Sequence, residues 1–185
     1  MRSSAIALTA VLLAGCGGSG LAQPTPTPTA PATTAAPATS PPTGEVTLTT
    51  TLSAASEVPP VTGAEASGSG TATVIIRTAR NNAGQLSAAT AEFDIQLSGF
   101  PPGTIVTGAH IHDGVAGVNG PVLVNTGITA DAPLELADGT GTIARAGIVV
   151  DLEVAQRILE DPEEFYVNVH STNNPGGVVR GQLSE

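Results

Sequence analysis

The chain has 185 residues, and its 6 basic side chains against 16 acidic ones give a formal net charge of −10. Nucleic-acid binding is not expected, because neutralising phosphates requires clustered cations and this chain has none. Aromatic residues make up only 2% of the chain, whereas Gly (22), Pro (15), Val and Thr are frequent, which favours an all-β module with turn-rich connections. A single cysteine allows no intramolecular disulfide, so the core must supply the stability.

The first 15 residues have the layout of a secretory signal peptide. A positive start at Met1-Arg2 precedes an apolar run over residues 5–14, which is too short to span a bilayer. Residues 13–16, Leu-Ala-Gly-Cys, resemble a bacterial lipobox, in which Cys16 is lipidated and becomes the new N-terminus. The alternative is an ordinary cleaved signal in which Cys16 has no role. We favour the lipid anchor, because the only cysteine falls where the motif needs it, and we expect the protein on the periplasmic or extracellular face of a bacterial membrane.

Residues 16–44 are rich in Pro, Thr, Ala and Ser and include a Pro-Thr repeat at positions 24–29. Such a segment has too little apolar surface to offset its chain entropy, so it is predicted to be a disordered linker, extended at about 3 Å per residue. It would hold a domain clear of the membrane, with or without O-glycosylation of its threonines. The folded domain is therefore expected at residues 45–185.

Short β patterns recur between turn signals along this domain and predict about eight or nine strands. The fold class that this spacing indicates is all-β, an antiparallel Greek-key β-sandwich or barrel. One helix is predicted over residues 152–160, with Asp151 as its N-cap and Asp161-Pro162 as its end. The expected strands are Val46–Leu52, Thr71–Arg77, Ala88–Leu97, Thr104–Ile111, Val122–Asn125, Gly139–Ala146 and the two arms of a hairpin within Phe165–Leu183.

The final hairpin turns at the cluster 173–177, Asn-Asn-Pro-Gly-Gly. Alternate side chains of a strand share a face, so Phe165, Val167 and Val169 are predicted to face the core. His170 on the first arm and Arg180 on the second then lie on the opposite face, which we expect to be the wetter one.

Two of the 3 histidines, His110 and His112, alternate along a predicted strand and project from its non-core face, about 7 Å apart at the Cα level. Two imidazoles at this spacing can converge on one copper or zinc ion, and His170 has the right parity to be a third ligand. Neutral imidazoles ligate, so binding is expected to weaken as the pH falls through about 6. The alternative is that these are ordinary surface residues, with His110 and His112 bonded to the turn at Asp113 and His170 packed against Asn173 or Arg180.

Several ordered motifs between about residues 48 and 183 resemble the CHRD domain, a family named after chordin and also found singly in bacterial exported proteins. This resemblance implies a Greek-key β-sandwich, similar in layout to copper–zinc superoxide dismutase. By that analogy His110, His112 and His170 are copper ligands, and Arg180 is a cation that faces an anion near the metal. The motifs are Glu57-Val-Pro-Pro60, Ala109-His-Ile-His112, Asn119-Gly-Pro121, Tyr166-Val-Asn-Val-His170, Asn174-Pro-Gly-Gly177 and Arg180-Gly-Gln-Leu183.

The chain departs from the dismutase pattern, since it has no fourth histidine to bridge two metals, no zinc-ligand cluster and no second cysteine. Motifs for nucleophilic catalysis, phosphate binding and dithiol chemistry are absent too. The favoured function is therefore an exported, lipid-anchored binding module of the cell envelope with a copper site, and no catalytic residues are assigned. One alternative is a copper-dependent redox enzyme of superoxide-dismutase type. The other is a metal-free structural or adhesive module that binds a protein or glycan partner.

Overall fold

The structure is a computed structural model that describes residues 43–185. The predicted signal peptide, Cys16 and the linker up to residue 42 lie outside the described residues. The first strand begins at Thr43, two residues ahead of the domain start expected at Glu45. Within residues 43–185, no helix is both long enough and apolar enough to cross a membrane.

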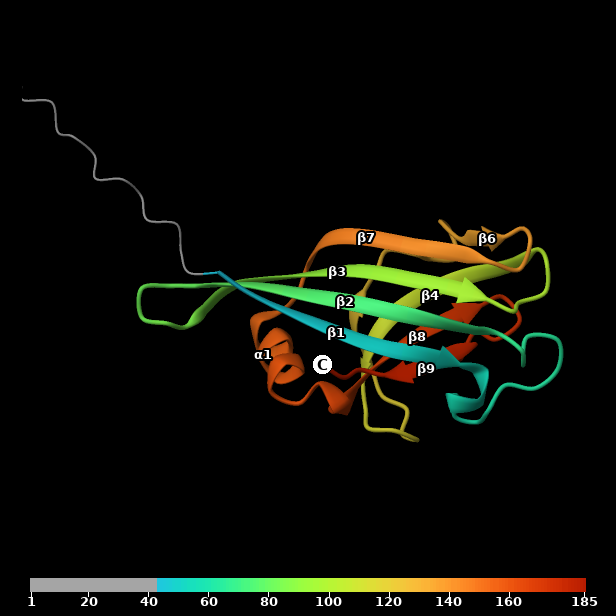
Figure 1. The fold of residues 1–185 in the computed structure, drawn as a ribbon, viewed down its shortest axis with the longest axis horizontal. Coiled ribbons are helices and arrows are strands. Elements are labelled where there is room, and N and C mark those ends of the chain that lie inside the picture. Colours follow the sequence, from blue (N-terminus) through green and yellow to red (C-terminus); the bar gives the residue numbers. More distant parts are fainter. Residues whose placement is uncertain (1–42) are drawn as a thin grey trace, which may run out of the picture. The chain divides into compact units, whose positions relative to one another are not determined.

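Nine strands, one α-helix and two short 3-10 helices form the described part of the chain (Figure 1). The prediction of an all-β chain with one helix is confirmed. The strand β6 was not predicted, because its three residues directly follow a turn sequence at Asp131-Ala132-Pro133. In chain order the elements are β1 (Thr43–Ser53), η1 (Ala54–Ser56), β2 (Ser69–Arg80), β3 (Leu86–Ser98), β4 (Thr104–Asp113), β5 (Val122–Asn125), β6 (Leu134–Leu136), β7 (Gly141–Val149), α1 (Leu152–Glu160), η2 (Pro162–Glu164), β8 (Phe165–Ser171) and β9 (Val179–Gln182).

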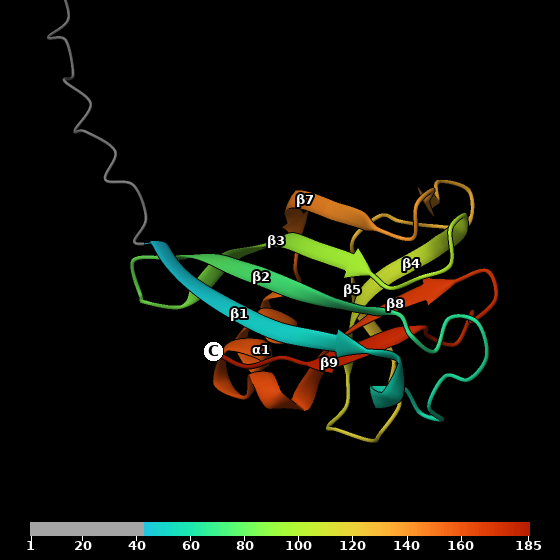
Figure 2. The ribbon, with the colours of Figure 1, turned by 45° about the vertical axis from the view of Figure 1, so that its right-hand side comes forward.

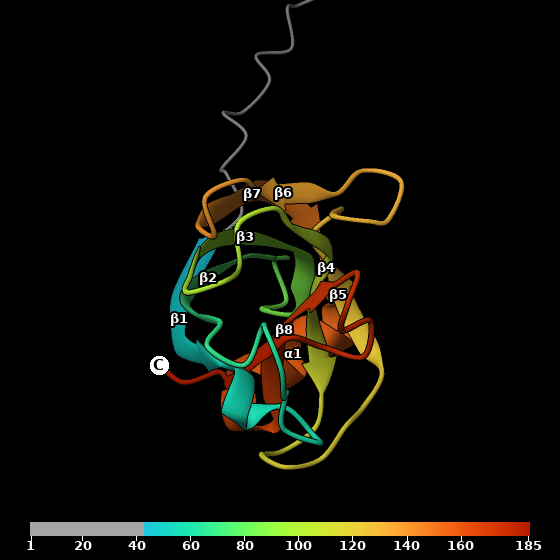
Figure 3. The ribbon, with the colours of Figure 1, turned by 90° about the vertical axis from the view of Figure 1, so that its right-hand side faces the viewer.

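All strand pairs are antiparallel, and the strands follow the order β5-β4-β8-β9-β1-β2-β3-β7. Strand β4 follows β3 in the sequence but does not pair with it, because the connection between them crosses to the other part of the sheet. The last strand, β9, pairs with the first, β1. At the remaining gap β6 pairs with β4 and contacts β7, so the sheet curls into a nearly closed barrel (Figure 3). Closure leaves little free sheet edge.

The barrel interior follows from the alternation of apolar side chains along the strands. On β2 the buried apolar residues are Ala72, Val74 and Ile76, and on β3 Phe93 and Ile95 lie on the matching parity. Each large apolar side chain removed from water in this way contributes roughly 1.5–3 kcal/mol. With no disulfide available, this core carries the stability of the domain.

The helix α1 packs near the end of the barrel at which β1 begins (Figure 2). Its N-cap is Asp151, as predicted, and the Oδ1 of Asp151 accepts from the backbone N–H groups of Glu153 (2.9 Å) and Val154 (3.2 Å). Arg157 donates to a carboxylate oxygen of Asp113 at 2.9 Å. Since Asp113 is the last residue of β4, this ion pair links the helix to the strand that carries two of the histidines.

The hairpin of β8 and β9 has the predicted parity. Asn168 pairs with Arg180 on the polar face, and the valines that alternate with them, Val167, Val169 and Val179, are buried in the core. The expectation that the polar face is wet was wrong. Tyr166 is 1% exposed, and Asn168 and Arg180 are each 2% exposed. The loops over residues 54–68, 114–121 and 172–178 supply the atoms that cover this face, and the hairpin sequence alone does not reveal them.

Candidate metal centre

Two adjacent strands bring the three histidines to one face. His110 and His112 alternate on β4 and lie opposite Asn168 and Tyr166 of β8. His170 lies opposite Gly108, one step along the same pair of strands. All three imidazoles therefore project from the outer face of the β4–β8 pair, away from the apolar interior.

The histidines converge as the sequence predicts. One ring nitrogen from each residue can be chosen so that all three lie within 4.8 Å of one another. The ring centroids are 4.9 Å apart for His110 and His170, and 5.6 Å apart for the other two pairs. These distances position the three histidines to hold one metal ion.

Gly108 makes room for this convergence. A Cβ atom added at this position would lie 2.8 Å from Cε1 of His110 and 3.3 Å from Cδ2 of His170. Any larger side chain would occupy the space in which these two rings approach each other. Gly108 was not predicted as a site residue, although a glycine two residues before a His-x-His pair is a local signal for it.

Each histidine also has one buried ring nitrogen without a hydrogen-bond partner within the described residues. These atoms are Nδ1 of His110, Nε2 of His112 and Nε2 of His170. A buried polar atom without a partner is costly, and most such atoms in native proteins bind protein groups or water. Three such ring nitrogens in one cluster can bind a metal ion together, because an unprotonated imidazole nitrogen has a lone pair to donate.

Backbone carbonyls fix the orientation of two of the rings. The Nδ1 of His112 lies 3.0 Å from the carbonyl oxygen of Gly120, and the Nδ1 of His170 lies 3.0 Å from that of Pro175. A carbonyl can only accept, so each Nδ1 carries the proton and each Nε2 keeps its lone pair. Histidine ligands of metals are commonly held by such a second hydrogen bond. The alternative in which His110 and His112 bond the turn at Asp113 was wrong, since the Asp113 carboxylate pairs with Arg157.

Burial keeps the three imidazoles neutral at pH 7. It lowers the pKa of His110 to about 4, with smaller contributions from His170 and His112 beside it. Burial likewise lowers the pKa of His112 and of His170, against the opposing effect of their carbonyl hydrogen bonds. Protons therefore compete for the lone pair of His110 at a lower pH than the value near 6 expected for an ordinary imidazole.

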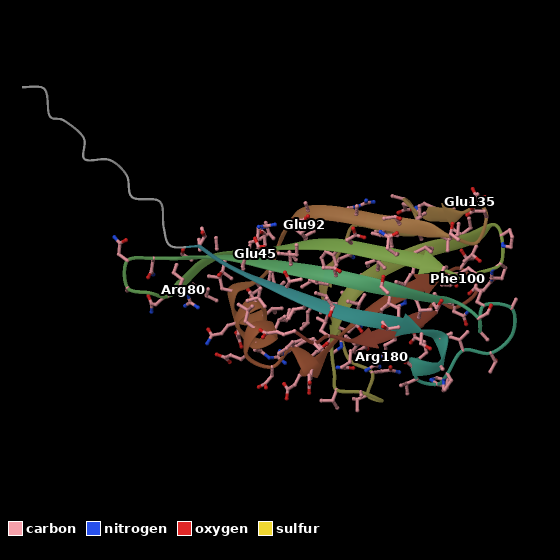
Figure 4. All side chains as sticks on the ribbon, in the orientation of Figure 1. Glu45, Arg80, Glu92, Phe100, Glu135 and Arg180 are labelled. Carbon is pink, nitrogen blue, oxygen red and sulfur yellow. The ribbon has the colours of Figure 1, made fainter. Side chains whose placement is uncertain are left out.

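Arg180, labelled beside β9 in Figure 4, lies on the same face as the histidines but is buried under the loop that follows β4. Its guanidinium carbon stands 3.4 Å from the centre of the Tyr166 ring, and that ring stacks on His112 at 4.9 Å. The guanidinium donates to the carbonyl of Val115 at 2.9 Å and to Oδ1 of Asn119 at 3.2 Å. Arg180 is 2% exposed, and these hydrogen bonds hold the loop in place. The dismutase analogy implied instead that Arg180 faces an anion in solvent, and the burial of its side chain does not fit that role.

Asn119 connects the covering loops to each other. Besides accepting from Arg180, it donates from Nδ2 to the carbonyl of Val58 at 2.8 Å. The carbonyl of the next residue, Gly120, accepts from the Nδ1 of His112. The N–H of Gly120 donates to the Tyr166 hydroxyl at 3.2 Å. The segment Glu57–Pro60 is thus a loop that lies over the polar face.

Three neutral imidazoles form a donor set that suits copper, zinc or nickel, and not calcium or magnesium, which prefer oxygen. Protein ligands at three positions leave at least one coordination position for water or another small ligand. The fold and the site together define a class: a nearly closed antiparallel β-barrel with three histidines on its outer face that are positioned to hold a metal ion.

The chain matches the family model of the CHRD domain over residues 48–183. This match runs from the middle of β1 to the end of the final hairpin and covers most of the chain, and the chain belongs to the CHRD-domain family. No curated protein and no solved structure matches the chain.

Proposed function

We propose that this protein is an exported CHRD-domain binding module that is lipid-anchored to the cell envelope through Cys16 and holds a copper ion at His110, His112 and His170. The observation that carries the proposal is the cluster of three buried ring nitrogens without partners, two of them aimed by carbonyl hydrogen bonds. The signal-peptide and lipobox patterns at the start of the chain support export and anchoring.

Affinity favours copper among the metals that imidazole suits. For a given set of nitrogen ligands, affinity rises along the first-row divalent series to Cu²⁺ and falls again at Zn²⁺. Because the ring nitrogens are already deprotonated at pH 7, binding need not displace protons from them. The chain's acidity adds a weak attraction for any cation.

A copper titration tests the proposal directly. The full chain carrying Cys16→Ser, which prevents lipidation, is titrated with Cu²⁺ and with Zn²⁺ by calorimetry and, for copper, by electron paramagnetic resonance. One equivalent of copper is expected, with nitrogen hyperfine structure in its spectrum and with higher affinity than zinc. The triple variant His110→Ala/His112→Ala/His170→Ala is expected to lose this equivalent.

The matched control replaces three exposed polar residues of β1, as Thr47→Ala/Thr49→Ala/Thr51→Ala, and should leave copper binding as it is. Equal copper binding by the histidine triple variant and the parent chain would contradict a metal site at these residues. The metal-free structural module would then be the better reading, and protein or glycan partners should be sought.

The open coordination position favours one second candidate, a copper-dependent redox enzyme of superoxide-dismutase type. His110 and His170 are only partly buried, so a small ligand can approach from their side. Superoxide removal by the copper-loaded chain, compared with the same concentration of free copper, distinguishes the two functions. A binding module gives no excess activity.

A further inference from the structure

A buried carboxylate from a distant part of the chain lies behind one of the histidines. Glu65, in the connection between η1 and β2, is 2% exposed. Its Oε2 accepts from the hydroxyl of Ser171 at 2.6 Å and from Nδ2 of Asn174 at 2.6 Å, and its Oε1 accepts from Nδ2 of Asn173 at 3.0 Å. Both oxygens are therefore satisfied by a single short segment, the turn between β8 and β9.

This turn carries the carbonyl that orients His170. Ser171 Oγ also accepts from the N–H of Asn174 at 3.0 Å, which closes the turn immediately before Pro175. The carbonyl of Pro175 then accepts the Nδ1 proton of His170 at 3.0 Å. Glu65 is thus connected to the Nδ1 of His170 by its hydrogen bond to Asn174, by the peptide backbone from Asn174 to Pro175, and by the hydrogen bond of the Pro175 carbonyl.

We infer that Glu65 is a positioning residue of the metal centre, which orders the 171–175 turn so that Pro175 fixes the tautomer and direction of His170. This inference rests on the proposed function for its role in metal binding, although its structural part concerns the metal-free protein. Loss of the group that hydrogen-bonds a metal-ligating histidine typically weakens metal binding by roughly 10- to 100-fold, and Glu65 acts on that group, the Pro175 carbonyl, through the turn.

The molecule contains its own internal comparison. His112 is held in the same manner by the carbonyl of Gly120, but that loop is fixed by Arg180 and Tyr166 and has no hydrogen bond to Glu65. Loss of the Glu65 carboxylate should therefore release His170 while His112 stays as it is. A residue that merely stabilised the whole domain would affect both rings alike.

The first test uses the metal-free full chain with Cys16→Ser, labelled with ¹⁵N on its imidazoles. Ring nitrogen shifts report the tautomer of each histidine. In the parent chain, His170 and His112 are expected as Nδ1–H tautomers with slowly exchanging protons. In Glu65→Ala, His170 alone should become a mixture of tautomers with a fast-exchanging proton. The control Glu135→Ala removes the same charge from an exposed site on β6 and should change neither ring.

If Glu65→Ala does not fold, Glu65→Gln is measured instead. The amide of the substituted side chain keeps one acceptor oxygen, but its NH₂ group faces the NH₂ group of Asn173 or Asn174, so one hydrogen bond is lost. In the double variant Glu65→Gln/Asn174→Asp, the new carboxylate accepts from that NH₂ group and restores the hydrogen bond. Faster exchange of the His170 ring proton in Glu65→Gln, and recovery in the double variant, support the inference. An unchanged His170 ring in the folded variants, or equal changes at His170 and His112, overturns it.

Copper titration of the same variants addresses the metal centre. Glu65→Ala is expected to bind copper roughly 10- to 100-fold more weakly than the parent chain, with Glu135→Ala unchanged. If the parent chain binds no copper, the proposed function fails while the tautomer result still decides what Glu65 does. If the parent chain binds copper and Glu65→Ala binds it equally well, the role of Glu65 in metal binding is refuted.

Discussion

Glu57 is a carboxyl group that the covering loops remove from water near Asn168 and Arg180, on the polar face of the β8–β9 hairpin. It is 5% exposed, and burial raises its pKa from 4.5 to about 7, against the opposing effects of Arg180 and of a hydrogen bond from Asn168. Gly177 lies close to this carboxyl: its φ is +135°, and an added Cβ would lie 2.6 Å from a carboxylate oxygen. At neutral pH the carboxyl is therefore near its titration midpoint.

The raised pKa of Glu57 makes the stability of the domain depend on pH in a definite direction. The folded state holds this proton up to about pH 7, whereas the unfolded chain releases it near pH 4.5. The contribution is fully present below pH 4.5 and is lost as the pH rises through 7. A shift of this size corresponds to about 3 kcal/mol between the two protonation states.

Glu57→Gln keeps the shape of the protonated carboxyl and cannot ionise. We expect it to match the parent chain at pH 4.5 and to raise the free energy of unfolding by about 2–3 kcal/mol at pH 8, measured by urea denaturation of the metal-free protein. Glu135→Gln, at an exposed site, should follow the parent chain at both values of pH. A Glu57→Gln chain that is less stable than the parent at pH 8 would show that the charge of Glu57, paired with Arg180, is needed for stability.

At the scale of elements, the site is a property of the β4–β8 pair. The strand register places His170 opposite Gly108 and one step from His110, so two neighbouring strands set the spacing of the three rings. The missing side chain at Gly108 is part of that geometry, because it leaves the space between two imidazoles free.

Gly108→Ala tests this geometry. Gly108 does not have a positive φ, so alanine is tolerated by the backbone there, but its Cβ would lie 2.8 Å from the ring of His110. We expect copper affinity to fall at least about tenfold while the thermal midpoint changes little, as measured by calorimetric titration and by circular dichroism. Gly176→Ala, where nothing lies within 4 Å of the added Cβ and φ is not positive, is the matched control. Copper affinity that falls equally in both variants would contradict a specific role for Gly108.

The elements themselves could be predicted because their signals are local. Alternation of apolar residues located the long strands, the N-cap Asp151 located the helix, and parity placed His110, His112 and His170 on one face. The surroundings of that face could not be predicted in the same way. Glu65 reaches a turn more than a hundred residues further along the chain, and no local pattern marks a residue for such a contact.

At the scale of the whole molecule, the covering loops change the character of the site. Parity alone indicated an exposed face with a free arginine, whereas the loops after η1, β4 and β8 enclose Arg180 and lower the pKa of all three histidines. Burial of a polar face is a property of the complete fold, because the segments that cover it come from three separate connections. The same burial leaves one ring nitrogen of each histidine without a hydrogen-bond partner among residues 43–185.

The residues that form the candidate centre all lie within the CHRD match, whereas the proposed anchor is Cys16. Metal binding and membrane attachment should therefore be separable. In a bacterial host that processes lipoproteins, the parent chain is expected in the membrane fraction, with a mature N-terminus at Cys16 that carries the mass of attached lipid. A single acyl chain gives only marginal attachment, so stable anchoring requires more than one. Cys16→Ala should move the protein out of the membrane fraction and leave copper affinity unchanged. A Cys16→Ala chain that remains with the membrane, or a parent chain whose mature N-terminus carries no lipid, would contradict the anchor. Neither outcome would bear on the histidine site, because its three candidate ligands all lie within the described residues 43–185.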